Sequence, residues 1–129
     1  MSVPAQQYFS YTGVTRVVKF RIRDGKASEF YKYAANISKA LEAEKSAGLI
    51  TGFAMHHTVD FVGVDKYDVS LVITYKDMAT FDTLSKKVDP ILAKAYGTPE
   101  NRAANSKMGD DSCEVVSSEL LRDIVVKPQ

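Results

Sequence analysis

An alternating run of apolar and polar residues between Leu49 and Tyr75 limits the possible folds more than any other feature. In Leu49–Val59 and again in Tyr67–Tyr75, large apolar or aromatic side chains stand at odd positions and mostly smaller or polar ones at even positions. Successive side chains of a β-strand point to opposite faces, so this period indicates two strands with one face on a core. The short break between them, which contains Gly63, is typical of an antiparallel hairpin.

Three further features predict the elements on either side of this hairpin. Val14–Ile22 alternates in the same way and predicts a strand. Ala27–Lys45 has apolar residues at helical spacing and predicts a helix that ends before Gly48. A second helix is expected to begin after Asp77, which is placed to cap it, and to kink or restart near Pro90, which has no backbone donor.

The two ends of the chain carry weaker patterns. Pro99–Ser112 is polar, and within it Glu100–Met108 predicts a short helix followed by a loop. Glu114–Val126 predicts a last strand, although its middle also suits a helix. Met1–Thr12 has no clear period and predicts an arm that is frayed or ordered by contact. The chain of 129 residues is expected to be a single domain, with its body at 13–126.

The order strand, helix, strand, strand, helix, strand is that of the ferredoxin-like fold. Right-handed crossovers place the first strand between the third and the fourth, with all neighbours antiparallel. We therefore predict an α+β protein with a βαββαβ antiparallel sheet and two helices on one face of it.

With these elements the chain resembles the dimeric α+β barrel superfamily. The features that carry the resemblance are the first strand followed by Asp24-Gly25-Lys26 and a long helix, the hairpin around Gly63, the break at Asp89-Pro90 and the closing strand Cys113–Leu121. The resemblance implies two chains that pair their sheets into a barrel with the helices outside. Members include cofactor-free monooxygenases, haem-degrading enzymes, stress-response proteins and proteins of unknown function, and the chain resembles this last group.

One family activity is disfavoured by the composition. The haem-degrading members are known for a set of Asn, Trp and His residues. Asn36 stands on the first predicted helix, but the chain contains no Trp. We therefore expect no haem and no other cofactor.

The sheet also carries apolar residues on the face that two helices cannot cover. Val17, Ile50, Ala54 and Val72 lie opposite the odd-numbered set. A second copy of the sheet would bury them, and twofold pairs are the commonest oligomers. We expect a homodimer.

His57 is the candidate functional residue. It is expected on the helix-covered face, opposite residue 69, at the end of the sheet where the first helix starts and the second ends. The side chains expected around it are Phe53, Met55, Tyr31, Tyr67 and Tyr96. A titratable His ringed by Tyr is typical of a pocket for a small apolar or aromatic molecule. The alternative is a core-edge His that only hydrogen-bonds to a Tyr hydroxyl or a backbone carbonyl.

Three functions remain open on this pattern. The first is a binding protein for a small apolar or aromatic ligand held between sheet and helices. The second is a cofactor-independent monooxygenase or isomerase in which His57 accepts a proton and Tyr67 or Tyr96 orients the substrate. The third is a non-enzymatic stress-response or assembly protein whose interior is filled.

Arg16 raises a separate question, because it stands on the apolar face of the first strand. A buried charge needs a partner, so we expect a structural ion pair, for which Glu44 is the candidate, in preference to an anion site.

Composition excludes several other classes. A net charge of +1 gives no field that would attract nucleic acid. No segment has the roughly 20 apolar residues of a membrane span. The first residues lack the pattern of a signal peptide, so a soluble cytoplasmic protein is expected, although a signal removed earlier would leave the same sequence. His56 and His57 point to opposite faces and predict no metal site.

Overall fold

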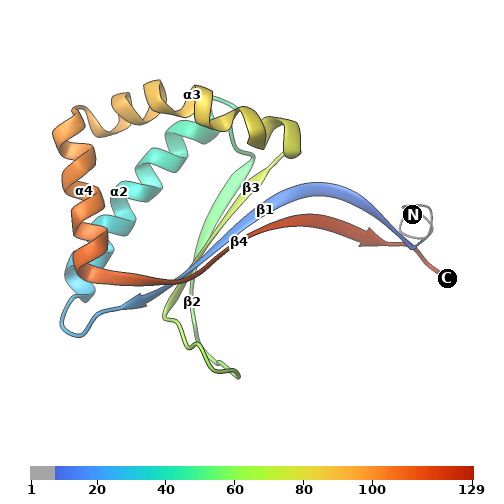
Figure 1. Ribbon diagram of the computed structural model, residues 1–129, viewed down its shortest axis with the longest axis horizontal. Coiled ribbons are helices and arrows are strands. Elements are labelled where there is room, and N and C mark those ends of the chain that lie inside the picture. Colours follow the sequence, from blue (N-terminus) through green and yellow to red (C-terminus); the bar gives the residue numbers. More distant parts are fainter. Residues whose placement is uncertain (1–7) are drawn as a thin grey trace.

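The computed structural model describes residues 8–129, which form one antiparallel sheet with all three helices on the same side of it (Figure 1). The elements in chain order are β1 (Phe9–Ile22), α2 (Ala27–Ser46), β2 (Gly52–His57), β3 (Val69–Tyr75), α3 (Met78–Tyr96), α4 (Pro99–Ser112) and β4 (Cys113–Val126). The strand order is β2-β3-β1-β4, which confirms the predicted ferredoxin-like topology with β1 between β3 and β4.

The core lies between the sheet and α2. Phe30 and Leu41 of α2 are buried against β1 and β3, with Ile37 partly buried beside them, which is the stripe that the helical spacing predicts. On the strands the buried core side chains are Val14, Phe20, Val69, Leu71, Ile73 and Tyr75. α3 contributes less, since Met78, Phe81 and Leu84 are only partly buried on this core.

Two strands, β1 and β2, differ in length from the sequence pattern. β1 begins at Phe9 instead of Val14, because residues 9–13 pair with the end of β4 across a bulge between Tyr11 and Gly13. β2 is shorter than predicted and begins only at Gly52. Residues 1–7 of the predicted N-terminal arm lie outside the described residues.

α3 and α4 also depart from the prediction. α3 is one helix that continues through Pro90, so the chain does not restart there, and the kink predicted as the alternative stays a prediction. Asp77 caps it as predicted by accepting a hydrogen bond from the Thr80 amide at 2.7 Å. α4 contains the short helix predicted at Glu100–Met108 but extends to Ser112, where a loop was predicted.

Packing explains why α4 continues through Gly109. A Cβ atom at this position would lie 2.5 Å from Cε1 of Tyr33 on α2, so glycine is required by the close approach of the two helices. Thr98 caps the start of α4 by accepting a hydrogen bond from the Asn101 amide. The contact between Tyr33 and Gly109 joins residues far apart in the sequence, so local composition does not predict it.

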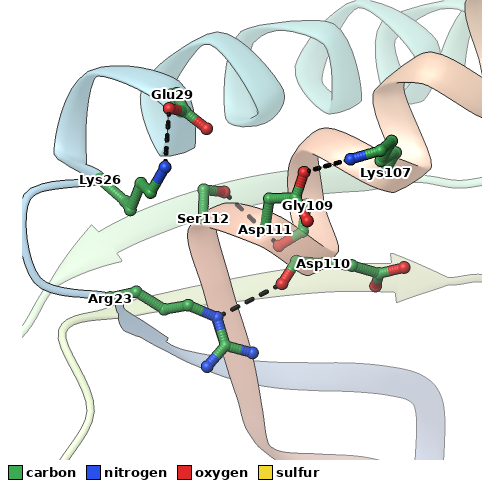
Figure 2. A network of polar contacts seen from close by, with 8 residues as sticks. All are labelled: Arg23, Lys26, Glu29, Lys107, Gly109, Asp110, Asp111 and Ser112. Carbon is green, nitrogen blue, oxygen red and sulfur yellow. Dashed lines mark hydrogen bonds and ion pairs between the residues drawn. The ribbon is translucent and has the colours of Figure 1, made fainter.

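Polar contacts fix the end of α4 to the turn that joins β1 and α2 (Figure 2). The Arg23 guanidinium donates to the backbone oxygen of Asp110 at 3.3 Å, and the Arg23 amide donates to the Ser112 oxygen at 2.9 Å. Lys107 pairs with Asp111 at 2.7 Å and lowers the pKa of that carboxyl. These contacts set the direction in which the chain enters β4.

The uncovered face of the sheet is apolar along one row. Ala54, Val72 and Val17 stand side by side across β2, β3 and β1, and on β4 the row ends at Glu119, with Leu121 one row away. Ile50, which was predicted on this face, is instead buried in the core at 3% exposure, because it precedes β2 and strand alternation does not apply to it. The apolar area available to a partner sheet is therefore smaller than predicted.

A long two-stranded arm projects from this sheet beyond the helices (Figure 1). It is made of the first part of β1 and the last part of β4, which pair up to Phe9 and Val126. Its exposed apolar side chains include Tyr11, Ile124, Val125 and Val126. An arm of this kind has no core of its own within the described chain.

Candidate functional site

His57 is the last residue of β2, a strand at the edge of the sheet, and it pairs with Val69 as predicted. Its Nε2 atom lies 3.2 Å from the Tyr31 hydroxyl, and the two ring centroids are 5.8 Å apart. The predicted meeting of the end of β2 with the start of α2 is therefore confirmed. Both side chains remain open to solvent, with Tyr31 at 43% exposure.

Apolar groups form the inner side of this pair. The buried Phe30 ring packs edge-on against Tyr31 with centroids 5.4 Å apart, which fixes the Tyr31 ring on α2. Met55 and Phe53 share the helix-side face of β2 with His57 and are partly buried against the core. The arrangement is a hydrogen-bonding His–Tyr pair at the rim of an apolar layer.

Tyr67 and Tyr96 lie elsewhere. Tyr67 packs edge-on against Phe61, and the Lys19 ammonium lies 5.0 Å from its ring centroid on the uncovered side of the sheet. Tyr96 accepts a hydrogen bond from Asn105 of α4 at 3.3 Å. Within residues 8–129 no hydrogen bond or ring contact joins either of them to His57.

The reasons for these two placements differ. Tyr67 has an odd number, but it precedes β3, so the alternation that places His57 does not extend to it. Tyr96 ends α3 and is held by α4, an element that the sequence predicted only in part. Sequence spacing therefore brings Tyr31 to His57 and places Met55 and Phe53 on the same face of β2, but it does not locate the other two tyrosines.

Two residues beside His57 were missed by sequence reasoning. The Thr58 amide donates to the Asp68 oxygen at 2.9 Å, and the Asp68 carboxylate accepts from the Ile22 amide at 2.8 Å. This pairing joins the base of the hairpin to the end of β1. The buried Thr58 hydroxyl has no hydrogen-bond partner in the described chain. Their only sequence signal is their position, directly after one strand and directly before the next.

Arg16 and Glu44 lie at the opposite end of the sheet and do not form the expected ion pair. The Arg16 guanidinium donates to Ser118 at 3.2 Å and lies 5.7 Å from the Phe81 ring centroid. Glu44 is buried, and burial raises the pKa of its carboxyl. No hydrogen bond or ion pair to this carboxyl occurs in the part of the chain described here.

Cys113 is excluded as a nucleophile by its surroundings. It is buried, its thiol lies 3.3 Å from the Gly109 oxygen, and burial raises its pKa above the ordinary value. A thiol in this state is protonated at neutral pH and reacts slowly. Neighbouring Tyr33 is held neutral in the same way, since burial raises its pKa.

Four hollows open at the surface of residues 8–129. One of about 390 Å³ lies between the start of the arm and the start of α3, and one of about 410 Å³ lies beside Tyr33 and Cys113. One of about 350 Å³ lies along the α3–α4 connection. One of about 340 Å³ lies among α2, α3 and α4. None of these four includes His57 in its lining, and the exposed His57 side chain lies at the edge of the sheet beside Tyr31.

Across residues 8–129 no three His, Cys, Asp or Glu side chains are grouped so that they would hold a metal ion. Among the helices described, none has the length and apolar character of a membrane span.

Comparison with solved structures identifies the architecture. The chain is similar to HapK from Hahella chejuensis (18% identity, 85% of this chain and 91% of that chain, TM-score 0.52). It is also similar to protein SO0527 from Shewanella oneidensis (15% identity, 91% and 96%, TM-score 0.55). A third similar structure is a dimeric ferredoxin-like protein of unknown function from Thermobifida fusca (14% identity, 92% and 95%, TM-score 0.50). The fold is ferredoxin-like.

The ferredoxin-like fold is the extent of what these similarities establish, since the identities are low. No protein-family model and no curated protein sequence matches the chain. Many unrelated functions occur on ferredoxin-like sheets, so function has to be argued from the residues of the site.

Proposed function

We propose that the protein is a homodimer that holds a small apolar or aromatic molecule against His57 and Tyr31, at the edge of the sheet beside α2. The observation that carries this proposal is the 3.2 Å contact between His57 Nε2 and the Tyr31 hydroxyl. A ring nitrogen and a phenol in contact at an exposed rim offer a donor and an acceptor to a ligand. Met55 and then Phe53 continue the same face of β2 with apolar surface.

The ligand class follows from this combination. An aromatic molecule with one hydroxyl or carbonyl group would place its polar atom at the His–Tyr pair and its ring against the apolar layer. Pockets for such molecules are mostly apolar with a few convergent polar groups. The exposure of both side chains in the single chain leaves room for a second copy to cover the ligand.

Dimerisation is supported by surface that a single chain leaves open. The uncovered row of Ala54, Val72 and Val17, the apolar arm, and the exposed Val62 and Val64 of the hairpin break all lie outside the core. Exposed apolar surface of this extent is typical of a protein interface. The similar protein from Thermobifida fusca is described as dimeric.

A cofactor-independent monooxygenase or isomerase is the second candidate function. It is favoured by the same contact, because a neutral His57 beside a tyrosine hydroxyl can accept a proton from a bound substrate while the hydroxyl orients it. In this reading Tyr31 takes the orienting role expected of Tyr67 or Tyr96.

Binding is tested with 2-naphthol as the probe, titrated into ¹⁵N-labelled protein and followed by NMR. We expect the amide signals of Tyr31, Met55 and His57 to shift, and His57→Ala to weaken binding about tenfold, the size of one good hydrogen bond. His56→Ala is the matched control, since its side chain lies on the other face of the same strand.

The outcomes separate the functions. Equal binding by His57→Ala and His56→Ala contradicts the ligand proposal, and so does an absence of shifts at Tyr31, Met55 and His57. Either result leaves the non-enzymatic assembly role. If a substrate is turned over, His57→Ala should reduce kcat by about 100-fold or more for a general base and leave it unchanged otherwise.

A further inference from the structure

We propose a second binding site in the hollow among α2, α3 and α4, for a small molecule that carries a carboxylate. The hollow measures about 340 Å³, which is within the range of small-ligand pockets. Its polar lining comes from all three helices and consists of Asn36, Lys39, Tyr96, Asn101 and Asn105.

A chain of hydrogen bonds holds this lining in one arrangement. Asn105, only 5% exposed, accepts a hydrogen bond from the Asn36 amide at 2.9 Å and donates its own amide to the Tyr96 hydroxyl at 3.3 Å. The Asn101 side-chain amide donates to the Tyr96 backbone oxygen at 3.0 Å. Both the oxygen and the nitrogen of the Asn105 side-chain amide are therefore engaged, and its orientation is fixed by its neighbours.

This hydrogen-bond network leaves two groups of the lining unused, the Tyr96 hydroxyl proton and Lys39. Because the Tyr96 oxygen accepts from Asn105, its own proton is available as a donor. Lys39, an exposed residue of α2, contributes to the lining and has no ion pair or hydrogen bond within residues 8–129. A phenol proton and an uncompensated positive charge at the same hollow fit a carboxylate.

The remaining walls fix the rest of the ligand. Ala95, Ala104 and Met108 complete the lining with small or adaptable apolar groups. A short aliphatic or aromatic body fits such walls, whereas a large polar one does not. The ligand class is therefore a small carboxylic acid with an apolar body.

A purely structural role for this hydrogen-bond network explains fewer of these features than a ligand site does. Amides at a helix seam need only one another, and three hydrogen bonds would suffice to join the helices. Interfaces between helices that hold no ligand are normally filled by larger apolar side chains, because protein interiors are close-packed. Here alanines line the seam and a lysine without a counter-ion faces it.

This site is independent of the function proposed above. Tyr96 has no contact with His57 in the described chain, and the two sites use different residues of α2. A failure at one site therefore leaves the other unaffected.

Sodium benzoate is the probe, titrated to millimolar concentration into ¹⁵N-labelled protein. We expect shifts of the Tyr96, Ala104 and Asn105 backbone amides and of the Asn36 and Asn105 side-chain amides. Lys39→Met should weaken binding about tenfold, and benzyl alcohol, which lacks the charge, should bind about tenfold more weakly than benzoate. Lys32→Met is the matched control, because Lys32 is exposed on the same helix and does not line the hollow.

Tyr96→Phe provides a second variant and should lower the affinity without moving Lys39. Its folding is checked by thermal unfolding, since the change removes one acceptor of Asn105. Absence of shifts at the three-helix hollow, unchanged affinity in Lys39→Met, or equal binding of benzyl alcohol each overturns the proposal.

Discussion

At the residue scale, the buried carboxyl of Glu44 is the clearest source of pH-dependent stability. Burial raises the pKa of Glu44 above its ordinary value of 4.5, and no described group compensates its charge. The folded state therefore binds the proton more tightly than the unfolded state. The negative charge costs stability as pH rises through the interval between the ordinary and the raised pKa, and this cost is absent below the ordinary value.

The corresponding prediction is that Glu44→Gln raises the thermal midpoint at pH 7 and leaves it unchanged near pH 3. A gain of about 1 kcal/mol corresponds to roughly 3–5 °C in a domain of this size. Glu42→Gln, an exposed position on the same helix, is the control and should show no such pH dependence. A gain that is equal at both pH values would contradict the argument.

Gly109 gives a second residue-scale prediction. Adding a methyl group should lower the free energy of unfolding by about 1–3 kcal/mol, because it would meet the Tyr33 ring at 2.5 Å in a packed seam. Chemical denaturation of Gly109→Ala measures the loss. In a Tyr33→Leu background the same change should cost clearly less, and an equal cost would show that the ring is not the cause.

At the scale of elements, the arm formed by β1 and β4 is the part that the single chain supports least. Two strands alone are marginally stable in water. Within the arm, the Arg122 guanidinium lies 3.6 Å from the Tyr11 ring centroid, a contact between its own two strands. Stability of the arm should therefore depend on the second copy.

Hydrogen exchange tests this dependence. We expect the amides of Tyr11 and Ile124 to be protected in the dimer and to exchange at least about tenfold faster when the dimer is dissociated. Val18, in the part of β1 that lies between β3 and β4, should stay protected in both states. Equal protection of the arm in both states would show that it is stable by itself.

At the scale of the whole molecule, the uncovered face of the sheet predicts the oligomeric state. We expect light scattering at micromolar concentration to give the mass of two chains. Val72→Lys should shift it to that of one chain, since Val72 is the centre of the apolar row between Ala54 and Val17. Thr83→Lys, on the exposed side of α3, is the control. A wild-type protein of monomer mass would contradict the dimer.

The sequence was sufficient for the topology and for half of the His57 site. Alternation and helical spacing report which side of an element is buried, and the order of elements then limits the sheet to one arrangement. This reasoning places His57 opposite Val69 and brings Tyr31 to it, as the structure shows. It also identifies Phe30 and Leu41 as core residues.

Only the tertiary structure decided where elements end and which side chains meet across them. α4 continues through Gly109 because Tyr33 lies against it, and Tyr96 is held by Asn105 instead of facing His57. Ile50 is buried because the chain reaches the core before β2 begins. Periodicity describes a segment's own two faces, whereas these features depend on contacts between segments far apart in the chain, which a local pattern does not contain.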